Sequence, residues 1–261
     1  MQQQIISKLT AELMEAEEKL VPVEPLSVRY PELSVKDSYE IQLEWVQKKL
    51  EEGRVVIGKK VGLTSKAMQN MLGVNEPDYG HLLDHMKVTT GSVLSRKDFI
   101  KPKVEAEIGF ILKEDLCGPN VTYVDVLMAT EALVPTLEII DSRIEDWKIQ
   151  LVDTVADNGS SARAVIGEPF YEIEQIDLRT LSMTLLKNRE VTATGSGAAA
   201  LGHPAHAIAW LANKLADYNI SLKAGELILP GALSAAIDVD SGDEITAAFG
   251  KLGSVTISFR D

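Results

Sequence analysis

Two glutamates separated by a single residue are the most chemically suggestive feature of the sequence. Glu105 and Glu107 lie within the apolar run Val104–Leu112, which is typical of a buried strand. On a strand, the side chains of residues i and i+2 point to the same face, so both carboxylates face the same way. Close like charges repel, and a divalent cation such as Mg²⁺ or Mn²⁺ relieves that repulsion. The pair indicates a metal site, with a solvent-facing pair on an edge strand as the alternative.

A third glutamate strengthens the metal-site interpretation. Glu138 lies within Val134–Ile140, a run that is apolar on both sides of it, and a carboxylate buried in such a strand needs a partner. Arg143 follows closely and offers a local ion pair. The other interpretation is that Glu138 joins Glu105 and Glu107 in an open site for a hard cation, where water and substrate fill the remaining positions.

A lysine and a polar segment supply further candidates. Lys60 lies in a strand-like run, so its ammonium group either points inward, towards carboxylates or an anionic substrate, or lies on the surface. The segment 153–163 is polar and contains Asn158-Gly159, a strong turn signal. Such a loop often carries function, and a plain structural turn is an equally good interpretation.

The elements that would position these side chains fall into two regions. Apolar residues from Ile5 to Leu20 recur at helical spacing, and Ser34 with Asp37 forms the acidic version of a capping box. From residue 55 onward, short β-like runs alternate with turn residues. The sequence predicts a helical N-terminal region at 1–54 and a strand-rich catalytic domain at 55–261. The expected elements are helices at 5–20, 35–52, 124–133 and 204–218, and strands at 104–112, 136–140, 178–187, 190–194, 226–229, 244–249 and 252–259.

Composition limits the classes of function. The chain has 261 residues, 45% of them hydrophobic, and a formal net charge of −13. No stretch of Lys and Arg is dense enough to follow a nucleic-acid backbone. No apolar run reaches the ~20 residues that span a bilayer, and the N-terminus has no signal-peptide pattern. The single cysteine, Cys117, forms no internal disulfide. We expect a cytoplasmic protein with neither a nucleic-acid nor a membrane partner.

Seven short motifs, in order and spread over nearly the whole chain, resemble one known family. Together they are similar to the hydratase/decarboxylase branch of the fumarylacetoacetate hydrolase superfamily. As a set, they are far more specific than any one of them alone. The motifs are Gly58–Ser65, Pro77–Gly80, Val104–Ile108, Leu137–Arg143, Val155–Asn158, Leu201–Pro204 and Gly253–Val255.

The resemblance implies both a fold and a site. The fold would be α+β, with a mixed β-roll core of the fumarylacetoacetate hydrolase type and a helical N-terminal region. Mg²⁺ or Mn²⁺ would be held by Glu105, Glu107 and Glu138, with Lys60 contacting the substrate and Asp78 as a second catalytic residue. Family members are usually oligomers, so a homo-oligomer is expected, and a complex with the sister enzyme of the same pathway is plausible.

Two activities fit this branch, which acts on small 2-oxo acids late in the meta-cleavage degradation of catechols. One decarboxylates 2-oxo-3-hexenedioate (4-oxalocrotonate) to 2-hydroxypenta-2,4-dienoate through a metal-stabilised dienolate. The other adds water to that dienoate to give 4-hydroxy-2-oxopentanoate. Ser160, Ser161 and Arg163 resemble the decarboxylase version of their loop and are expected to bind substrate, with Arg163 recognising the second carboxylate. Asp78 resembles the hydratase version. We favour the decarboxylase.

Two further classes of protein are less compatible with the sequence. A non-catalytic metal-binding or carboxylate-binding protein would keep the three glutamates and show no turnover. A hydrolase that cleaves a carbon–carbon bond needs a base to activate water, usually a histidine with an acidic partner. The four histidines offer no convincing pair and lack zinc-site spacing, and His203 and His206 are expected to pack or cap a helix start.

Overall fold

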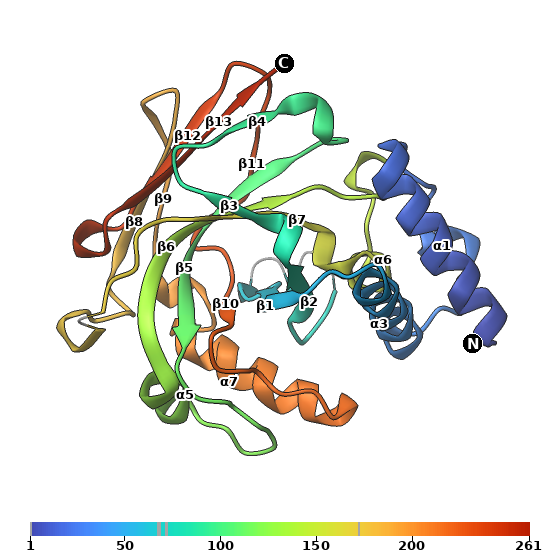
Figure 1. Ribbon diagram of the computed structural model, residues 1–261, viewed down its shortest axis with the longest axis horizontal. Helices are drawn as coiled ribbons and strands as arrows, with labels where there is room; N and C mark the ends of the chain where they lie inside the picture. The colour runs from blue at the N-terminus through green and yellow to red at the C-terminus, as the bar shows by residue number, and fades with distance from the viewer. Residues whose placement is uncertain (1, 67–68, 71–72, 172) are drawn as a thin grey trace.

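The protein is built from two β-sheets with helices packed against them (Figure 1). The computed structural model describes all residues except 1, 67–68, 71–72 and 172. The helices are α1 (Gln3–Lys19), α2 (Leu26–Arg29), α3 (Val35–Glu51), α5 (Tyr123–Ala129), α6 (Leu151–Ala156) and α7 (Pro204–Leu215).

The larger sheet carries most of the candidate chemistry. It has eight strands in the order β2-β1-β10-β5-β6-β7-β3, with β11 paired to β5. Its strands are β1 (Val56–Gly62), β2 (Asp78–Leu83), β3 (Lys87–Thr89), β5 (Lys103–Leu112), β6 (Thr130–Ile140), β7 (Ser161–Ile166), β10 (Leu227–Leu229) and β11 (Ile237–Asp238). The smaller sheet runs in the order β4-β13-β12-β8-β9. Its strands are β4 (Val93–Ser95), β8 (Ser182–Lys187), β9 (Glu190–Ser196), β12 (Glu244–Ala248) and β13 (Ser254–Arg260).

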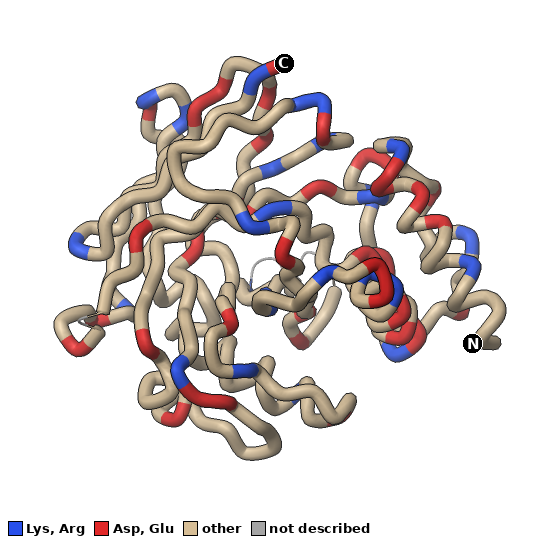
Figure 2. The backbone as a smooth tube through the Cα atoms, in the orientation of Figure 1, with Lys and Arg blue, Asp and Glu red and all other residues tan. Residues whose placement is uncertain are grey.

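The N-terminal helices begin and pack as the sequence predicts. Ser34 accepts a hydrogen bond from the Asp37 N–H while Asp37 caps the Ser34 backbone, so the predicted capping box starts α3. One face of α1, including Leu9 and Leu13, packs with Ile41 of α3 in a separate apolar cluster. Figure 2 shows acidic and basic residues interspersed along these two helices. The division of the chain into two domains at residue 54 stays a prediction.

The alternation of side chains on β5 separates the main core from the candidate site. Val104, Ala106 and Ile108 belong to an apolar core that also contains Ile257 and Phe259 of β13, so this core lies between the two sheets. Because strand side chains alternate, the intervening glutamates of β5 point away from the core. The strand predicted at 104–112 is therefore confirmed, and so is the prediction that its two glutamates share one face.

Two expected boundaries were wrong. The strand expected at 136–140 begins at Thr130 and continues through Pro135. The proline is tolerated because Pro135 lies just beyond the β6–β7 ladder, whose last pair is Thr136 with Ile166. The helix expected at 124–133 ends correspondingly early, at Ala129. The polar segment 153–163 is not an exposed loop but comprises part of α6, a buried turn and the start of β7.

The C-terminal half follows the predicted order of elements, although the strands expected at 178–187 and 252–259 begin later, at Ser182 and Ser254. Asn188 and Arg189 form the predicted turn between β8 and β9. His203 caps α7, because its Nδ1 accepts a hydrogen bond from the Ala205 N–H at 3.1 Å. The α+β class with a helical N-terminal region is confirmed. Within the part of the chain that is described, no helix is long and apolar enough to cross a membrane.

Candidate metal centre

Strands β5 and β6 bring three carboxylates together. Glu105 lies directly opposite Glu138 in the antiparallel ladder, and Glu107 follows on the same face of β5. One carboxylate oxygen from each of the three lies within 4.8 Å of the other two. Glu107 and Glu138 are buried and Glu105 is half-buried, so solvent reaches the cluster at Glu105.

Glu138 is contacted from two directions. Ser161 Oγ on β7 donates a hydrogen bond to Glu138 Oε1 at 2.8 Å, and Lys60 Nζ on β1 lies 3.4 Å from Oε2. Strands β10 and β5 separate β1 from β6, so this contact shows that the sheet curves around the carboxylates. Lys60 therefore points inward, and it is the cationic partner of Glu138. Arg143, the alternative partner considered from sequence, pairs with Asp157 instead.

Glu107 has one oxygen that a cation would satisfy. The Gly231 N–H donates to Glu107 Oε2 at 2.8 Å, whereas Oε1 is buried and has no hydrogen-bond partner in the described residues. A buried carboxylate oxygen without a donor costs free energy unless positive charge lies beside it. Three converging carboxylates are the hard oxygen ligands that Mg²⁺ and Mn²⁺ prefer, so the residues present fit such an ion.

Burial and mutual repulsion oppose full ionisation of this cluster. Burial, followed by Glu138 and Asp78, raises the pKa of Glu105 to about 7, although Lys60 acts in the opposite direction. Burial, Glu138 and Glu105 raise the pKa of Glu107 well above its usual range. Burial alone would lower the pKa of Lys60, but Glu138 and Asp78 raise it overall, so the carboxylates favour the ammonium form of Lys60. A cation bound at the cluster would therefore displace protons from it.

Asp78 lies in the same buried region as Lys60. It is on β2, paired in the ladder with Gly62 of the neighbouring strand β1. Thr154 Oγ1 donates to Asp78 Oδ2 at 3.4 Å, and burial raises the pKa of Asp78. Asp78 is also one of the carboxylates that raise the pKa of Lys60. The structure thus brings the two predicted catalytic residues into electrostatic reach of the three predicted metal ligands.

The three predicted substrate-binding residues point in different directions. Ser161 faces the carboxylates, whereas the Ser160 hydroxyl donates to Asp157 Oδ2 at 2.9 Å. Arg163 lies on the opposite face of β7 from Ser161. The reason is a β-bulge in the β6–β7 ladder, which leaves Ala162 without a partner and reverses the alternation of side chains.

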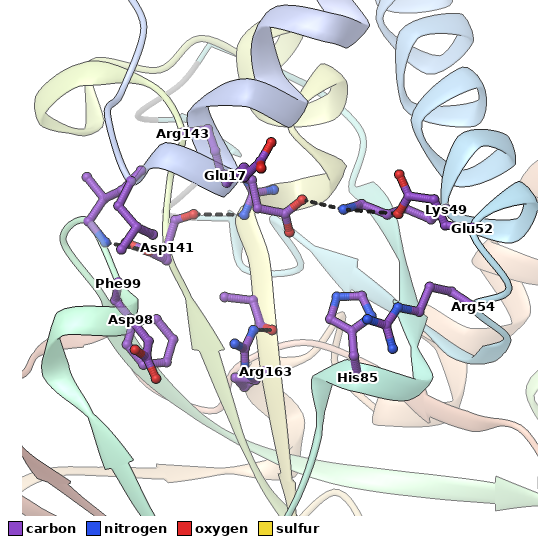
Figure 3. Close-up of a pocket in the computed structure, with 14 residues that line it drawn as sticks. Glu17, Lys49, Glu52, Arg54, His85, Asp98, Phe99, Asp141, Arg143 and Arg163 are labelled. Atoms are coloured by element: carbon purple, nitrogen blue, oxygen red, sulfur yellow. Dashed lines mark hydrogen bonds and ion pairs between the residues drawn. The ribbon is translucent and has the colours of Figure 1, made fainter.

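Arg163 lines a separate polar cavity of about 270 Å³ (Figure 3). Its guanidinium group lies 5.4 Å from the centre of the Phe99 ring, and Glu17, Arg54 and His85 line the same cavity. The carboxylate cluster does not line it. The expectation that Arg163 shares a site with Ser161 and the glutamates is therefore not met by the geometry.

Sequence reasoning missed two groups that shape the site. The first is the Gly231 N–H, which follows β10 at a φ of +110°, where a Cβ would lie 2.1 Å from Thr64 Oγ1. Pro230-Gly231 after an apolar strand is a turn signal, but it does not reveal what the N–H contacts. The second is Asp157, buried against Arg143, which the sequence marked only as part of a polar segment and of the Val155–Asn158 motif.

Comparisons with known proteins agree with this geometry. Residues 75–260 match the family model described as the C-terminal region of fumarylacetoacetate (FAA) hydrolase. A 2-hydroxyhexa-2,4-dienoate hydratase from Comamonas testosteroni is 43% identical over 99% of this chain and 98% of its own. A 4-oxalocrotonate decarboxylase from Pseudomonas putida is 44% identical over 88% of this chain and 87% of its own.

A solved structure extends the likeness to three dimensions. The 4-oxalocrotonate decarboxylase from Pseudomonas putida G7, complexed with magnesium and adipate, superposes with a TM-score of 0.96 at 38% identity. The match covers 99% of this chain and 98% of the other. From the matched family model and these near full-length relatives, this chain belongs to the fumarylacetoacetate hydrolase family, in the group that contains the decarboxylases and hydratases.

Proposed function

We propose that this protein is a divalent-metal-dependent lyase that decarboxylates 2-oxo-3-hexenedioate to 2-hydroxypenta-2,4-dienoate. The observation that carries the proposal is the convergence of Glu105, Glu107 and Glu138, with a buried Glu107 oxygen that has no described donor. The decarboxylase of TM-score 0.96 supports it, since that enzyme was solved with magnesium and with adipate, a dicarboxylate.

The three glutamates would hold Mg²⁺ or Mn²⁺. When bound, the ion supplies Lewis acidity that favours enolisation of a 2-oxo acid. The protein's contribution is to keep the glutamates in place, through the Ser161 hydroxyl on Glu138 and the Gly231 N–H on Glu107. Both contacts come from elements other than the strand that carries the glutamate, so they set the direction of each carboxylate.

Lys60 and Asp78 would act on the substrate. In the proposed reaction the carboxylate at C6 leaves as CO₂, and its bonding electrons move through the C3–C4 double bond to the oxygen on C2. The carboxylates around Lys60 favour its ammonium form, which can stabilise negative charge at that oxygen. Asp78, whose pKa burial raises, is placed to hold or move a proton.

A second candidate is the hydratase that adds water to 2-hydroxypenta-2,4-dienoate. Two observations favour it. Arg163, which was expected to recognise the second carboxylate of the decarboxylase substrate, lies in a different cavity. Asp78, which resembles the hydratase version of its motif, is close enough to Lys60 to raise the pKa of that lysine. The hydratase from Comamonas testosteroni also matches nearly the whole chain.

Product analysis distinguishes the two candidates. The pure protein with Mg²⁺ is incubated with 2-oxo-3-hexenedioate and, separately, with 2-hydroxypenta-2,4-dienoate. Release of CO₂ from the first supports the decarboxylase. Consumption of the second alone, with 4-hydroxy-2-oxopentanoate as product, supports the hydratase. Turnover of neither substrate with Mg²⁺ or Mn²⁺ supplied would refute the lyase proposal.

Self-association and a complex with the sister pathway enzyme stay predictions. Both are measurable by sedimentation, of the protein alone and of the protein mixed with that enzyme.

A further inference from the structure

Three consecutive residues with left-handed backbone conformation lie directly beside the candidate site. Asn158, Gly159 and Ser160 have φ values of +54°, +61° and +54°. Glycine adopts this conformation readily and asparagine does so at times, so the unfavourable backbone energy falls mainly on Ser160. The surrounding structure must hold the turn in place, and such strain is concentrated at functional sites.

A buried network around Asp157 and Arg143 holds this turn from one side. Arg143 donates to the Asp157 carboxylate and to three carbonyl oxygens, those of Asp141, Asp157 and Ser161. Asp157 Oδ2 in turn accepts from Ser160 Oγ at 2.9 Å. The guanidinium hydrogen bonds to Asp157 and Ser161 end on the residues that enter and leave the turn.

Asn158 holds the turn from the other side. Its Oδ1 accepts from the His81 N–H at 2.8 Å, and its Nδ2 donates to the His81 oxygen at 2.9 Å, so its side chain pairs with the backbone of β2. Gly80 beside it has no side chain, and a Cβ there would lie 2.4 Å from the backbone carbonyl oxygen of Asn158. The turn therefore lies flat against β2.

The turn covers the side chain of Lys60. A Cβ added to Gly159 would lie 2.8 Å from Lys60 Cε and 3.3 Å from Nζ, so the backbone of the turn contacts the end of the lysine. The same ammonium group lies 3.4 Å from Glu138 Oε2. Ser161, the next residue after the turn, donates to the same glutamate. Both contacts on Glu138 thus depend on where the turn lies.

We propose that Gly159 is a positioning residue, and that the Asn158–Ser160 turn holds the Lys60 ammonium group against Glu138 and over the substrate. This inference rests on the proposed function, in which Lys60 stabilises charge on the substrate. The turn itself need not touch the substrate. Its strained conformation fixes the lysine before substrate binds, so the enzyme does not have to order that side chain during the reaction.

The test is a double-mutant cycle between Gly159→Ala and Lys60→Ala. We expect Gly159→Ala to lower kcat by about 10- to 100-fold, because the added methyl group displaces the lysine by roughly 1 Å. KM and the Mn²⁺ affinity should stay within about threefold, since the glutamates are untouched. In the Lys60→Ala background the methyl group has free space, so Gly159→Ala should cause no further loss.

Two other variants separate positioning from backbone strain. Gly91→Ala places alanine at a φ of +81° with no atom within 4 Å, and it should leave kcat unchanged. Asn158→Gly removes both hydrogen bonds to His81 without adding bulk, and it should lower kcat but not in the Lys60→Ala background. Asn158→Gly also tests the proposal if Gly159→Ala fails to fold. Equal losses with and without Lys60, or an equal loss in Gly91→Ala, would overturn the proposal.

Failure of the proposed function would be recognisable separately. If the wild-type protein turned over neither substrate, the lyase proposal would fail and the cycle would be measured by urea unfolding of the metal-free protein. Gly159→Ala should then destabilise the wild type more than it destabilises Lys60→Ala. Equal destabilisation in both backgrounds would show that the turn does not position the lysine.

Discussion

Replacement of Lys60 by methionine tests whether the cluster needs positive charge. Lys60 Nζ lies 3.4 Å from Glu138 Oε2, and both side chains are buried. At an effective dielectric constant of 20, two unit charges at that distance attract by about 5 kcal/mol. Removal of one partner from a buried ion pair costs about 3–5 kcal/mol. We therefore expect Lys60→Met to lose about 3–5 kcal/mol of unfolding free energy in EDTA.

A divalent cation should reverse most of this loss. At a concentration of 100 times its Kd, an ion that binds only the folded state adds about 2.7 kcal/mol to the stability of the wild type. The variant should bind the ion more tightly, because the neighbouring ammonium group no longer repels it. The gap between wild type and Lys60→Met should therefore be smaller in Mg²⁺ than in EDTA, although Lys60→Met should lose turnover.

The adjacent lysine provides a matched control. Lys59 is also a buried ammonium on β1, and its Nζ lies 2.6 Å from Glu226 Oε1, in an ion pair of its own. Lys59→Met should be destabilised to a similar degree, with the same gap in EDTA and in Mg²⁺. The assay is urea unfolding at pH 8, above the pKa of about 7 for Glu105. The reasoning would be refuted if Mg²⁺ left the stability gap between wild type and Lys60→Met unchanged. It would also be refuted if Mg²⁺ narrowed the gap of Lys59→Met by the same amount.

Three further predictions concern pH, the metal and specificity. Burial lowers the pKa of His81 to about 3 from 6.5, so the folded protein keeps it neutral while the unfolded chain takes up a proton. Stability should therefore fall as the pH drops from 6.5 towards 3, by up to about 2.7 kcal/mol between pH 6.5 and 4.5. In His81→Asn, the amide replaces the ring donor that lies 3.1 Å from Gln42 Oε1. Urea unfolding at the two pH values should show that this variant loses less stability than the wild type. An equal loss of stability would contradict this assignment. Glu107→Gln should weaken Mn²⁺ binding by more than the roughly 10- to 100-fold typical of an outer-shell partner, measured by electron paramagnetic resonance titration, and unchanged binding would remove Glu107 from the metal site. Arg163→Ala should keep kcat/KM for 2-oxo-3-hexenedioate within about threefold, because Arg163 lines a cavity that the carboxylate cluster does not line. A loss confined to this dicarboxylate would instead restore the role first expected of Arg163.

Local patterns in the sequence were sufficient for much of the site. The spacing of Glu105 and Glu107 sets a shared face as soon as the strand is recognised, since alternation follows from covalent geometry. Glu138 was identifiable because a carboxylate within an apolar run needs a partner. The capping box at Ser34 is equally local, since its two hydrogen bonds join residues three positions apart.

Register and curvature were beyond the reach of these patterns. The pairing of Glu105 with Glu138 depends on how β5 and β6 slide against each other, which no single strand specifies. The contact between Lys60 and Glu138 depends on the curvature of a sheet in which two strands lie between them. Arg163 was misplaced because one unpaired residue inverts the alternation on β7, and nothing in Ser160–Arg163 marks that residue.

Because Ala162 is unpaired, the side chains of β7 before and after it face different parts of the molecule. Ser161, before it, donates to Glu138, and Arg163, after it, lines the cavity with Phe99 and Glu17. Substitution of Arg163 would therefore leave the hydrogen bond from Ser161 to Glu138 in place. Deletion of Ala162 would remove the bulge and still leave these two side chains on opposite faces, because adjacent residues of a regular strand alternate.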